Sequence, residues 1–415
     1  MRAELDRTAL PGPTLDDIRA ARERVAAVVE TTPMESSRYL SGIAGAPVFL
    51  KAENLQRTGS YKIRGAYNRL SQLTPEERAL GVVASSAGNH AQGVALAARE
   101  LGIRATIFMP NGVALPKLQA TRGYGADVVL HGDVFDETNA AAREFAESSG
   151  GVFIPPFDHP DVVAGQGTLG LEILEQVPDV RTVVVPIGGG GLISGIAAAL
   201  ALAAPERDIR IVGVQASNAA AYPVSLEAGE IMTVTVTPTI ADGIAVARPG
   251  NLNFEIISRT VDEVVTVRDD EISRALVILL ERAKLVVEPA GAAGVAALLS
   301  GAVEVDGPTV VLLSGGNIDP MVMERVISRG LAADSRYLKV HIPLPDRPGQ
   351  LANIAGIIAG ANANVVEVLH TRHGAGLEIS EVGIEIHMET RGGEHAQLVL
   401  GALRDAGYRP QILDR

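Results

Sequence analysis

Short apolar runs that alternate with helical patterns constrain the fold of this chain more strongly than any other feature. Six such runs occur, at residues 82–84, 105–109, 126–130, 182–187, 209–214 and 309–313. Their residues are apolar almost throughout and do not alternate with polar ones, as expected for strands in a sheet that helices cover on both faces. We therefore predict the α/β class, with open twisted parallel sheets whose ligand sites lie at the carboxyl ends of the strands.

The composition is that of a large folded protein and argues against several classes of function. A chain of 415 residues with 47% hydrophobic content can bury sizeable cores in two or three domains. The absence of cysteine fits a reducing cytoplasm, and a formal charge of −13 without a basic cluster argues against a nucleic-acid partner. The N-terminus lacks a signal-peptide pattern, and the longest apolar stretch, residues 192–204, is well short of the roughly 20 residues that a membrane span needs. We expect a cytoplasmic protein with no membrane partner.

The rhythm of the sequence changes near Ser335 and divides the chain into two parts. We interpret residues 1–14 as a loose arm and residues 15–333 as one large domain, with a smaller subdomain at about residues 50–155 inserted in the larger one. Residues 336–415 form a second, small domain. Its predicted order is βαββαβ, with strands at residues 337–344, 365–372 and 381–389, helices at residues 351–361 and 395–406, and a short final strand.

One lysine lies in a segment that has little surface character. Lys62 is flanked by Tyr61 and Ile63, and Gly59 and Gly65 lie close by. A single lysine is usually a solvated surface charge. A desolvated lysine, however, loses its proton readily and is the residue used for Schiff-base chemistry with an aldehyde. Lys62 is therefore the first candidate for a catalytic residue.

Four consecutive glycines, Gly188, Gly189, Gly190 and Gly191, follow the predicted strand at residues 182–187. An apolar helix begins at once with Leu192, so the glycines do not form a linker. Backbone N–H groups without neighbouring side chains can converge on an anion, and the helix N-terminus adds its positive pole. A dinucleotide loop would instead need the spacing Gly-x-Gly-x-x-Gly. The alternative is a flexible loop without a ligand.

Two further segments follow predicted strand ends. Ser86-Ala87-Gly88-Asn89-His90 comes after residues 82–84 and can place polar groups around a small anion, although serine and asparagine are also ordinary helix caps. Ser314 follows the strand at residues 309–313 and begins Ser314-Gly315-Gly316-Asn317. Three of the four candidate segments are thus predicted at the carboxyl ends of strands, where a sheet of this kind binds its ligand.

Together these segments resemble the pyridoxal-phosphate (PLP) site of the threonine dehydratase family, which has PLP fold type II, the tryptophan synthase β-like fold. Ser60-Tyr61-Lys62-Ile63-Arg64-Gly65 resembles the cofactor-lysine motif of threonine and serine dehydratases and of serine racemase. Threonine synthases and cysteine synthases place an aspartate directly after the lysine, where this chain has Ile63. The resemblance extends over about residues 15–330 and implies that these residues form the PLP-dependent catalytic domain.

The resemblance also implies a role for each segment. Lys62 binds PLP covalently and acts as the catalytic base, and Tyr61 flanks the cofactor ring. Asn89 contacts the phenolic oxygen of PLP, and Ser314 faces its pyridine nitrogen. The phosphate-binding residues are Gly188, Gly189, Gly190, Gly191 and Leu192. The residues that hold the substrate carboxylate are Ser86, Ala87, Gly88, Asn89 and His90.

Four positions refine the expected reaction. Serine racemases carry a proton-donating serine at the position of Ala87, so alanine favours elimination without racemisation. The hydroxyl of Ser314 is neutral and does not keep the pyridine nitrogen protonated, which favours loss of a β-substituent over transamination. Relatives that bind a divalent metal use carboxylates where this chain has Gln215 and Ala221, so no metal site is expected.

The implied activity is that of a threonine ammonia-lyase, which converts L-threonine to 2-oxobutanoate and ammonia and also L-serine to pyruvate. Three alternatives stay open, namely a serine or 3-hydroxyaspartate ammonia-lyase, a racemase, and a catalytically silent amino-acid sensor.

Residues 336–415 resemble the ACT domain, a small regulatory fold. Asp346-Arg347-Pro348-Gly349 precedes the first helix of this domain, so backbone amides at the helix N-terminus could bind a carboxylate. The resemblance implies allosteric regulation by an amino acid or a nucleotide, and assembly as a homodimer or homotetramer. A βαββαβ domain without a ligand is the alternative, because a fold alone does not define a function.

Overall fold

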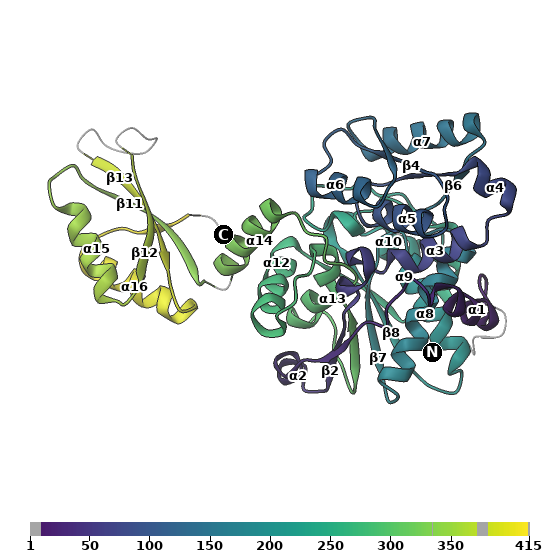
Figure 1. The fold of residues 1–415 in the computed structure, drawn as a ribbon. Helices are drawn as coiled ribbons and strands as arrows, with labels where there is room; N and C mark the ends of the chain where they lie inside the picture. The colour runs from purple at the N-terminus through teal and green to yellow at the C-terminus, as the bar shows by residue number, and fades with distance from the viewer. Residues whose placement is uncertain (1–9, 334, 372–380, 414–415) are drawn as a thin grey trace. The chain divides into compact units, whose positions relative to one another are not determined.

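Two mainly parallel sheets and one antiparallel sheet organise the chain (Figure 1). This computed structural model describes residues 10–333, 335–371 and 381–413. The chain divides into two units, Met1–Val322 and Met323–Arg415. Residues 1–9 of the predicted N-terminal arm, and Arg372 at the end of a predicted strand, lie outside the described residues.

The helices and strands alternate through most of the first 333 residues. The strands are β1 (Met34–Ser36), β2 (Val48–Lys51), β3 (Val82–Ser85), β4 (Ala105–Met109), β5 (Asp127–Leu130), β6 (Val152–Phe153), β7 (Thr182–Pro186), β8 (Arg210–Ala216), β9 (Glu263–Val267) and β10 (Thr309–Leu312). The helices are α1 (Leu15–Val25), α2 (Arg38–Ala44), α3 (Lys62–Ser71), α4 (Pro75–Leu80), α5 (Asn89–Glu100), α6 (Leu115–Gly123), α7 (Phe135–Ser149), α8 (Pro160–Gln176), α9 (Gly191–Ala203), α10 (Ala221–Ala228), α11 (Asn251–Thr260), α12 (Asp269–Ile278), α13 (Pro289–Leu299) and α14 (Pro320–Ala333).

The larger sheet has the strand order β1-β2-β10-β7-β8-β9, and only β1 runs antiparallel to its neighbour. Side chains of a strand alternate between the two faces of a sheet. Val183 and Val185 of β7 therefore pack in one cluster with apolar residues of α8 and α9. Val184 faces the other way, toward α13, where the position of a Cβ on Gly294 would lie 3.4 Å from its side chain. Helices thus cover both faces, which explains why the strand is apolar throughout.

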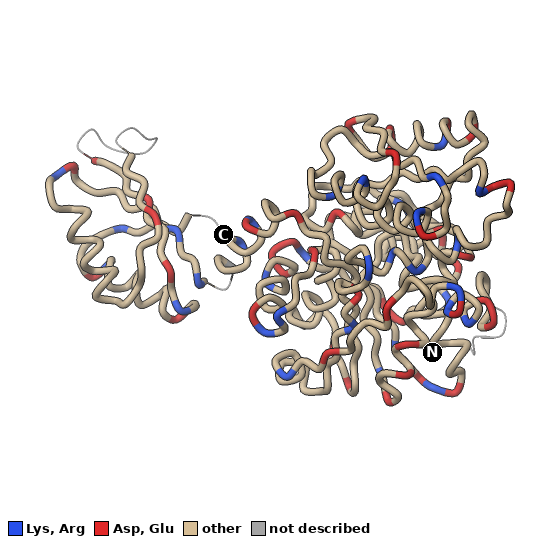
Figure 2. Tube along the Cα trace, viewed as in Figure 1, with Lys and Arg blue, Asp and Glu red and all other residues tan. Residues whose placement is uncertain are grey.

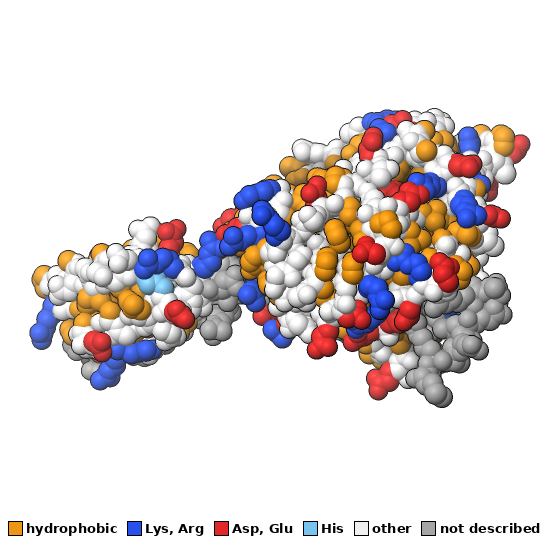
Figure 3. All heavy atoms as spheres, turned by 90° about the horizontal axis from the view of Figure 1, so that it is seen from below, with side chains coloured by type: hydrophobic (Ala, Val, Ile, Leu, Met, Phe, Trp, Pro, Cys, Tyr) orange, Lys and Arg blue, Asp and Glu red, His pale blue; other side chains and the backbone are white. Residues whose placement is uncertain are grey.

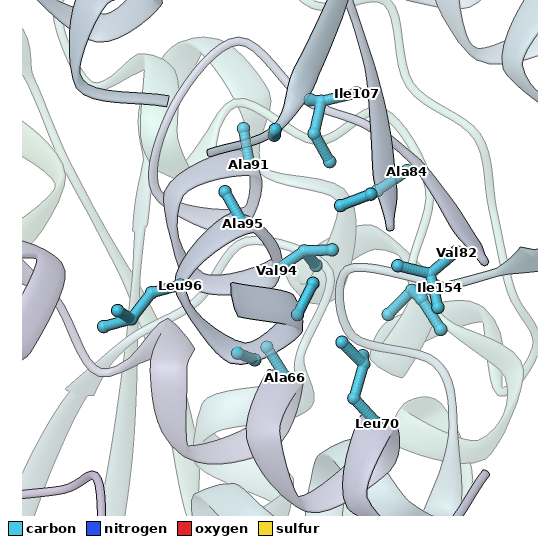
Figure 4. Close-up of a cluster of buried hydrophobic side chains, with 14 of the residues drawn as sticks. Ala66, Leu70, Val82, Ala84, Ala91, Val94, Ala95, Leu96, Ile107 and Ile154 are labelled. Carbon is cyan, nitrogen blue, oxygen red and sulfur yellow. The ribbon is translucent and has the colours of Figure 1, made fainter. Parts of the chain in front are cut away.

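The smaller sheet has the order β5-β4-β3-β6 and is entirely parallel. Val82 and Ala84 of β3 face a cluster that is formed mainly by α3 and α5 (Figure 4). Val83 faces the opposite side and packs with residues of α7. In Figure 1, α7 lies on one side of this sheet and α3 and α5 lie on the other.

The predicted parallel α/β fold is confirmed, and all six predicted strands are present with bounds that differ by two residues at most. Four strands were missed, namely β1, β2, β6 and β9. The strands β1 and β6 have only three and two residues. The edge strand β9 is partly exposed and has no continuous apolar run. The strand β2 ends in Lys51, and this charged residue did not indicate a buried strand, although its side chain is fully buried.

Residues 337–412 contain the predicted βαββαβ order. The elements are β11 (Tyr337–Pro345), α15 (Gln350–Gly360), β12 (Asn364–Thr371), β13 (Glu381–Glu389), α16 (Gly393–Asp405) and β14 (Gln411–Ile412). The sheet is antiparallel, with the order β12-β13-β11-β14. Every second residue of β11 from Leu338 to Leu344 is buried, and these side chains pack with apolar residues of α15 and α16. One polar face and one apolar face explain why the sequence alternates here.

Charges of both signs are interspersed along the trace in each unit (Figure 2), and apolar side chains lie between them on the face that Figure 3 presents. Among the described helices, none combines the length and the apolar character needed to cross a membrane.

Candidate active site

The carboxyl ends of three neighbouring strands bring three of the candidate segments together. Strand β10 lies between β2 and β7 and is parallel to both, so the segments that follow all three strands lie at one edge of the sheet. Ser60 forms an isolated β-bridge with Gly315, and the N–H of Tyr61 donates to the carbonyl of Ser314 at 3.2 Å. The predicted neighbourhood of the lysine segment and Ser314 is therefore present in the structure.

Lys62 is the first residue of α3 and is partly buried. Its Nζ donates to the carbonyl of Pro156 at 2.9 Å and lies 5.2 Å from the centre of the Tyr61 ring. Removal of the ammonium from water lowers the pKa of Lys62 to about 8, although the nearby carboxylate of Glu288 raises it. With this lowered pKa, a much larger fraction of the Lys62 amine is neutral near pH 7 than in an ordinary lysine, and the neutral amine is the nucleophile that Schiff-base formation requires.

The turn before Lys62 needs glycine at one position. Gly59 has a φ of +70°, and a Cβ at this position would collide with the side chain of Asn317. Asn317 Nδ2 in turn donates to the carbonyl of Thr58 at 2.6 Å. The turn is thus fixed against the segment that follows β10, which places the lysine.

The glycine loop presents a row of backbone donors without acceptors. In the described parts of the chain, no N–H from Gly188 to Leu192 is paired with an acceptor, and the first bonded amide is that of Ser194, which donates to the Gly190 carbonyl at 3.0 Å. Gly189, Gly190, Gly191 and Leu192 are buried. Buried N–H groups are almost always paired, so these donors fit the phosphate of a bound ligand.

Phe157 explains why two of these positions are glycine. A Cβ at Gly189 would collide with the Phe157 ring, and a Cβ at Gly191 would lie 2.9 Å from the Cβ of Phe157. Phe157 thus packs against the glycine loop.

The smaller sheet contributes Asn89, the first residue of α5. Its Nδ2 donates to Glu288 Oε1 at 2.6 Å, and its Oδ1 accepts from Asn317 Nδ2 at 2.8 Å. Glu288 is 4% exposed, and burial raises the pKa of its carboxyl to about 7, as does the neighbouring Asp242. The charge of Lys117, the bond from Asn89 and the charge of Lys62 act in the opposite direction. Glu288 is therefore a central polar group of this site.

The other residues of the predicted carboxylate loop differ in how accessible they are. Ser86, Ala87 and Gly88 are partly exposed, and Ser86 Oγ accepts from the Gly88 N–H at 3.1 Å. His90 is buried, and its Nε2 lies 3.0 Å from the carbonyl of Ile154. Burial lowers the pKa of His90 to about 3, and the charge of Lys62 adds to this effect. His90 is thus a neutral ring whose Nε2 faces a backbone carbonyl.

A salt bridge lies beside this loop. Lys117 Nζ of α6 is 2.7 Å from Asp242 Oδ2, which belongs to a short helix of residues Asp242–Ile244. A Cβ on Gly88 would lie 3.7 Å from the same Nζ. Neither residue was assigned a role from the sequence, because no motif marks a pair formed across 125 positions.

Ser314 is 4% exposed, and among the described residues its hydroxyl has no hydrogen-bond partner. This neutral group is available to a ring nitrogen. Gln215, at the position where a metal ligand was expected to be missing, uses its side-chain amide within the protein. Its Oε1 accepts from the Tyr222 N–H at 2.8 Å, and its Nε2 donates to the Ile187 carbonyl at 3.4 Å.

Arg64, for which the sequence suggested no role, belongs to a buried cluster of four charged side chains. Its guanidinium donates to Glu53 Oε1 at 2.8 Å and to Glu172 Oε1 at 2.6 Å, and Lys51 Nζ donates to Glu172 Oε2 at 2.6 Å. Desolvation lowers the pKa of Arg64, but the two carboxylates outweigh it, so the pKa is raised. The cluster joins α3, which begins with Lys62, to β2 and α8.

The comparisons with known proteins agree with this geometry. A model of the family described as pyridoxal-phosphate dependent enzyme matches residues 25–315. The chain is 47% identical over 401 residues to the L-threonine ammonia-lyase of Thermotoga maritima, which covers 96% of this chain and 99% of that protein. The solved structure of maize serine racemase is 36% identical with a TM-score of 0.73, and the match covers 77% of this chain and 98% of that one. The processed form of threonine deaminase isoform 2 from Solanum lycopersicum is also 36% identical, with a TM-score of 0.71, and the match covers 79% of this chain and 98% of that one.

The fold and the site therefore define an enzyme with PLP fold type II. The chain belongs to the family of pyridoxal-phosphate dependent enzymes, and its cofactor is pyridoxal 5'-phosphate. The resemblance drawn from the sequence is confirmed. The donors described above fit this cofactor, because a lysine with a lowered pKa, a row of buried unpaired amides and a buried free hydroxyl are what its aldehyde, phosphate and ring nitrogen require.

Proposed function

We propose that this chain is a threonine ammonia-lyase that converts L-threonine to 2-oxobutanoate and ammonia and also accepts L-serine, giving pyruvate. The observation that carries the proposal is the partly buried amine of Lys62, whose pKa is lowered to about 8, at the strand edge that also presents Ser314 and the glycine loop. The similarity to an L-threonine ammonia-lyase over 96% of this chain supports the same reaction.

Each residue of the site has a separate role in the proposed reaction. Bound PLP supplies the electron sink that makes the Cα–H bond of an amino acid acidic. Nζ of Lys62 accepts that proton as a general base. The amides from Gly188 to Leu192 would hold the cofactor phosphate, and Asn89 and Tyr61 would lie beside its ring. The neutral hydroxyl of Ser314 would leave the ring nitrogen unprotonated, which would favour loss of the β-hydroxyl over transamination.

Steady 2-oxo acid release from L-threonine and from L-serine by the PLP-loaded protein tests the proposal. We expect rapid formation of 2-oxobutanoate that disappears in Lys62→Ala and persists in Lys284→Ala, which replaces an exposed lysine. Borohydride reduction followed by peptide mapping should place the cofactor on Lys62, one of only five lysines in the chain. Cofactor binding without oxo acid release from either substrate would favour another β-hydroxy amino acid, or a silent sensor.

Serine racemisation is a second candidate, favoured by the fold match to maize serine racemase. The partly exposed Ala87 argues against it, because its methyl group has no proton to deliver. We expect no D-serine from L-serine in the native protein. Ala87→Ser, which adds only a hydroxyl, should produce a detectable rate of racemisation if this loop faces the substrate. D-serine formation by the native protein would contradict the lyase assignment.

We also propose that residues 336–415 form an ACT domain that regulates the enzyme, and that the protein assembles as a homodimer or homotetramer. The βαββαβ order and the antiparallel sheet of this unit support the proposal. Coupling between an effector site and an active site is typically about 1–3 kcal/mol, so an effector should change the apparent affinity for threonine roughly 5- to 150-fold. Titration with isoleucine, valine or a nucleotide, together with sedimentation, tests both statements.

A further inference from the structure

The carbonyl oxygen of Gly189 accepts three hydrogen bonds from behind the glycine loop. The Tyr222 hydroxyl of α10 donates at 3.0 Å, and Asn253 Nδ2 of α11 donates at 3.3 Å. The N–H of Gly250, directly before α11, donates at 3.1 Å. Tyr222 and Asn253 are fully buried, so water does not compete for these bonds. One carbonyl thus has three donors on one side.

This arrangement fixes the direction of the next amide. In a trans peptide unit the C=O and the N–H point in opposite directions. Because the oxygen of Gly189 points toward Tyr222 and Asn253, the N–H of Gly190 points away from them. That N–H belongs to the row of amides that have no acceptor among the described residues. A rotation of this peptide unit would replace a donor by a carbonyl oxygen and repel a phosphate.

The loop and its support are shaped to one another. Gly190 has a φ of +103°, and a Cβ at this position would collide with the Tyr222 hydroxyl. Glycine is therefore needed both for the backbone angle and for the approach of the tyrosine. Burial raises the pKa of Tyr222, and the charge of Asp158 adds to this, so the hydroxyl keeps its proton and stays a donor.

Further hydrogen bonds hold the two supporting side chains in place. The carboxylate of Asp158 accepts from the backbone N–H groups of Asn251 at 2.9 Å and Leu252 at 3.0 Å, which fixes the start of α11. Gln215 accepts from the Tyr222 N–H at 2.8 Å, which fixes the start of α10. The donors to Gly189 are therefore set before any ligand binds.

We propose that Tyr222 and Asn253 are positioning residues for the cofactor phosphate, which hold the Gly189 carbonyl away from the anion and aim the Gly190 amide at it. They act through the loop and do not touch the reacting atoms. The inference rests on the assignment of the glycine loop to the phosphate and is independent of the amino-acid substrate.

Comparison of PLP with pyridoxal, which lacks only the phosphate, tests the proposal. We would measure both dissociation constants by spectral titration of the cofactor-free protein. Tyr222→Phe keeps the ring and removes only the hydroxyl. One lost hydrogen bond is worth about 0.5–1.5 kcal/mol, so the affinity for PLP should fall roughly 2- to 10-fold while the affinity for pyridoxal stays the same. Tyr222→Phe combined with Asn253→Ala should enlarge the loss for PLP further. Tyr67→Phe, at a tyrosine packed against the core of the smaller sheet, is the matched control and should change neither value.

Two results would contradict the positioning role of Tyr222 and Asn253. An equal loss for PLP and pyridoxal, or no loss for either, would overturn the proposal. Inorganic phosphate provides a second reading, because its inhibition constant against PLP should rise in Tyr222→Phe by the same factor. A native protein that binds PLP no better than pyridoxal would instead refute the underlying assignment of the loop. That result is distinguishable, because it appears without any substitution.

Discussion

Asn89 Nδ2 donates a 2.6 Å hydrogen bond to Glu288 Oε1 and thereby links two positions 199 residues apart in the sequence. Asn89 begins the helix α5, which follows a strand of the smaller sheet. Glu288 directly precedes α13, which packs on the larger sheet. The bond joins the two sheets at the candidate active site. It also places a carboxyl with a pKa raised to about 7 near a lysine with a pKa lowered to about 8, so the two groups change charge within about one pH unit of each other.

The cofactor-free protein should lose stability as the pH rises through the range in which Glu288 ionises. Its pKa is raised from 4.5 to about 7, so the folded protein keeps a proton that the unfolded chain has lost, and stability falls as the pH rises between these values. Glu288→Gln removes this dependence. Between pH 4.5 and pH 8, the native protein should therefore lose about 3 kcal/mol in its free energy of unfolding relative to the variant. Urea unfolding at both pH values measures it, and parallel pH profiles would contradict the buried ionisation.

The rate at which PLP attaches to the cofactor-free protein should depend on the protonation of Lys62. Only the neutral amine attacks an aldehyde, so the rate should rise with pH and level off around a midpoint near 8, well below the ordinary 10.5. The carboxylate of Glu288 raises this pKa, so Glu288→Gln should move the midpoint lower. Stopped-flow absorbance across pH 6 to 10 measures both values. A midpoint at or above 10 would mean that the amine is solvated.

Replacement of Arg64 should lower the free energy of unfolding far more than replacement of a surface arginine that also pairs with a glutamate of α8. Arg64→Leu leaves the buried carboxylates of Glu53 and Glu172 without their partner, and breaking a buried pair in this way costs about 3–5 kcal/mol. Arg22→Ala is the matched control, because Arg22 contacts Glu175 of the same helix α8 in an exposed pair, where a loss below about 1 kcal/mol is typical. Denaturant unfolding of both variants decides the comparison, and similar losses would show that the cluster is not strongly coupled.

Two glycine-to-alanine substitutions should change stability in opposite directions. Gly65 lies where α3 crosses α8, and a Cβ there would lie 2.8 Å from the Val162 carbonyl and collide with the Gln166 amide. Gly65→Ala should therefore separate the two helices and destabilise the first unit. A Cβ on Gly401, within α16, would meet nothing within 4 Å. Gly401→Ala should stabilise the second unit by roughly 0.5–1 kcal/mol, because alanine is the better helix former. Calorimetry follows both changes, and a stabilised Gly65→Ala protein would contradict the close helix crossing.

Much of the site was predictable because local patterns carry it. Apolar runs predicted the ends of β3, β7 and β10, and three candidate loops follow these ends. The fourth candidate segment, which contains Lys62, leads into the helix α3 after β2. The second unit was predicted almost element by element, because alternation in β11 and helical spacing in α15 are properties of adjacent residues. The strand β2 was missed because its buried Lys51, which pairs with Glu172, does not fit a hydrophobic pattern.

The sequence by itself determined the fold class, the identity of Lys62 as the candidate base, and the glycine row that can face a phosphate. Only the tertiary structure decided which groups surround them. It brought Glu288 to Asn89, enclosed Arg64 between Glu53 and Glu172, and set Tyr222 and Asn253 behind the carbonyl of Gly189. The physical reason is that periodicity reports contacts within one helix or strand, whereas these pairs form between elements far apart in the chain. Their distances depend on the order of strands in the sheets and on the packing of the helices that cover them.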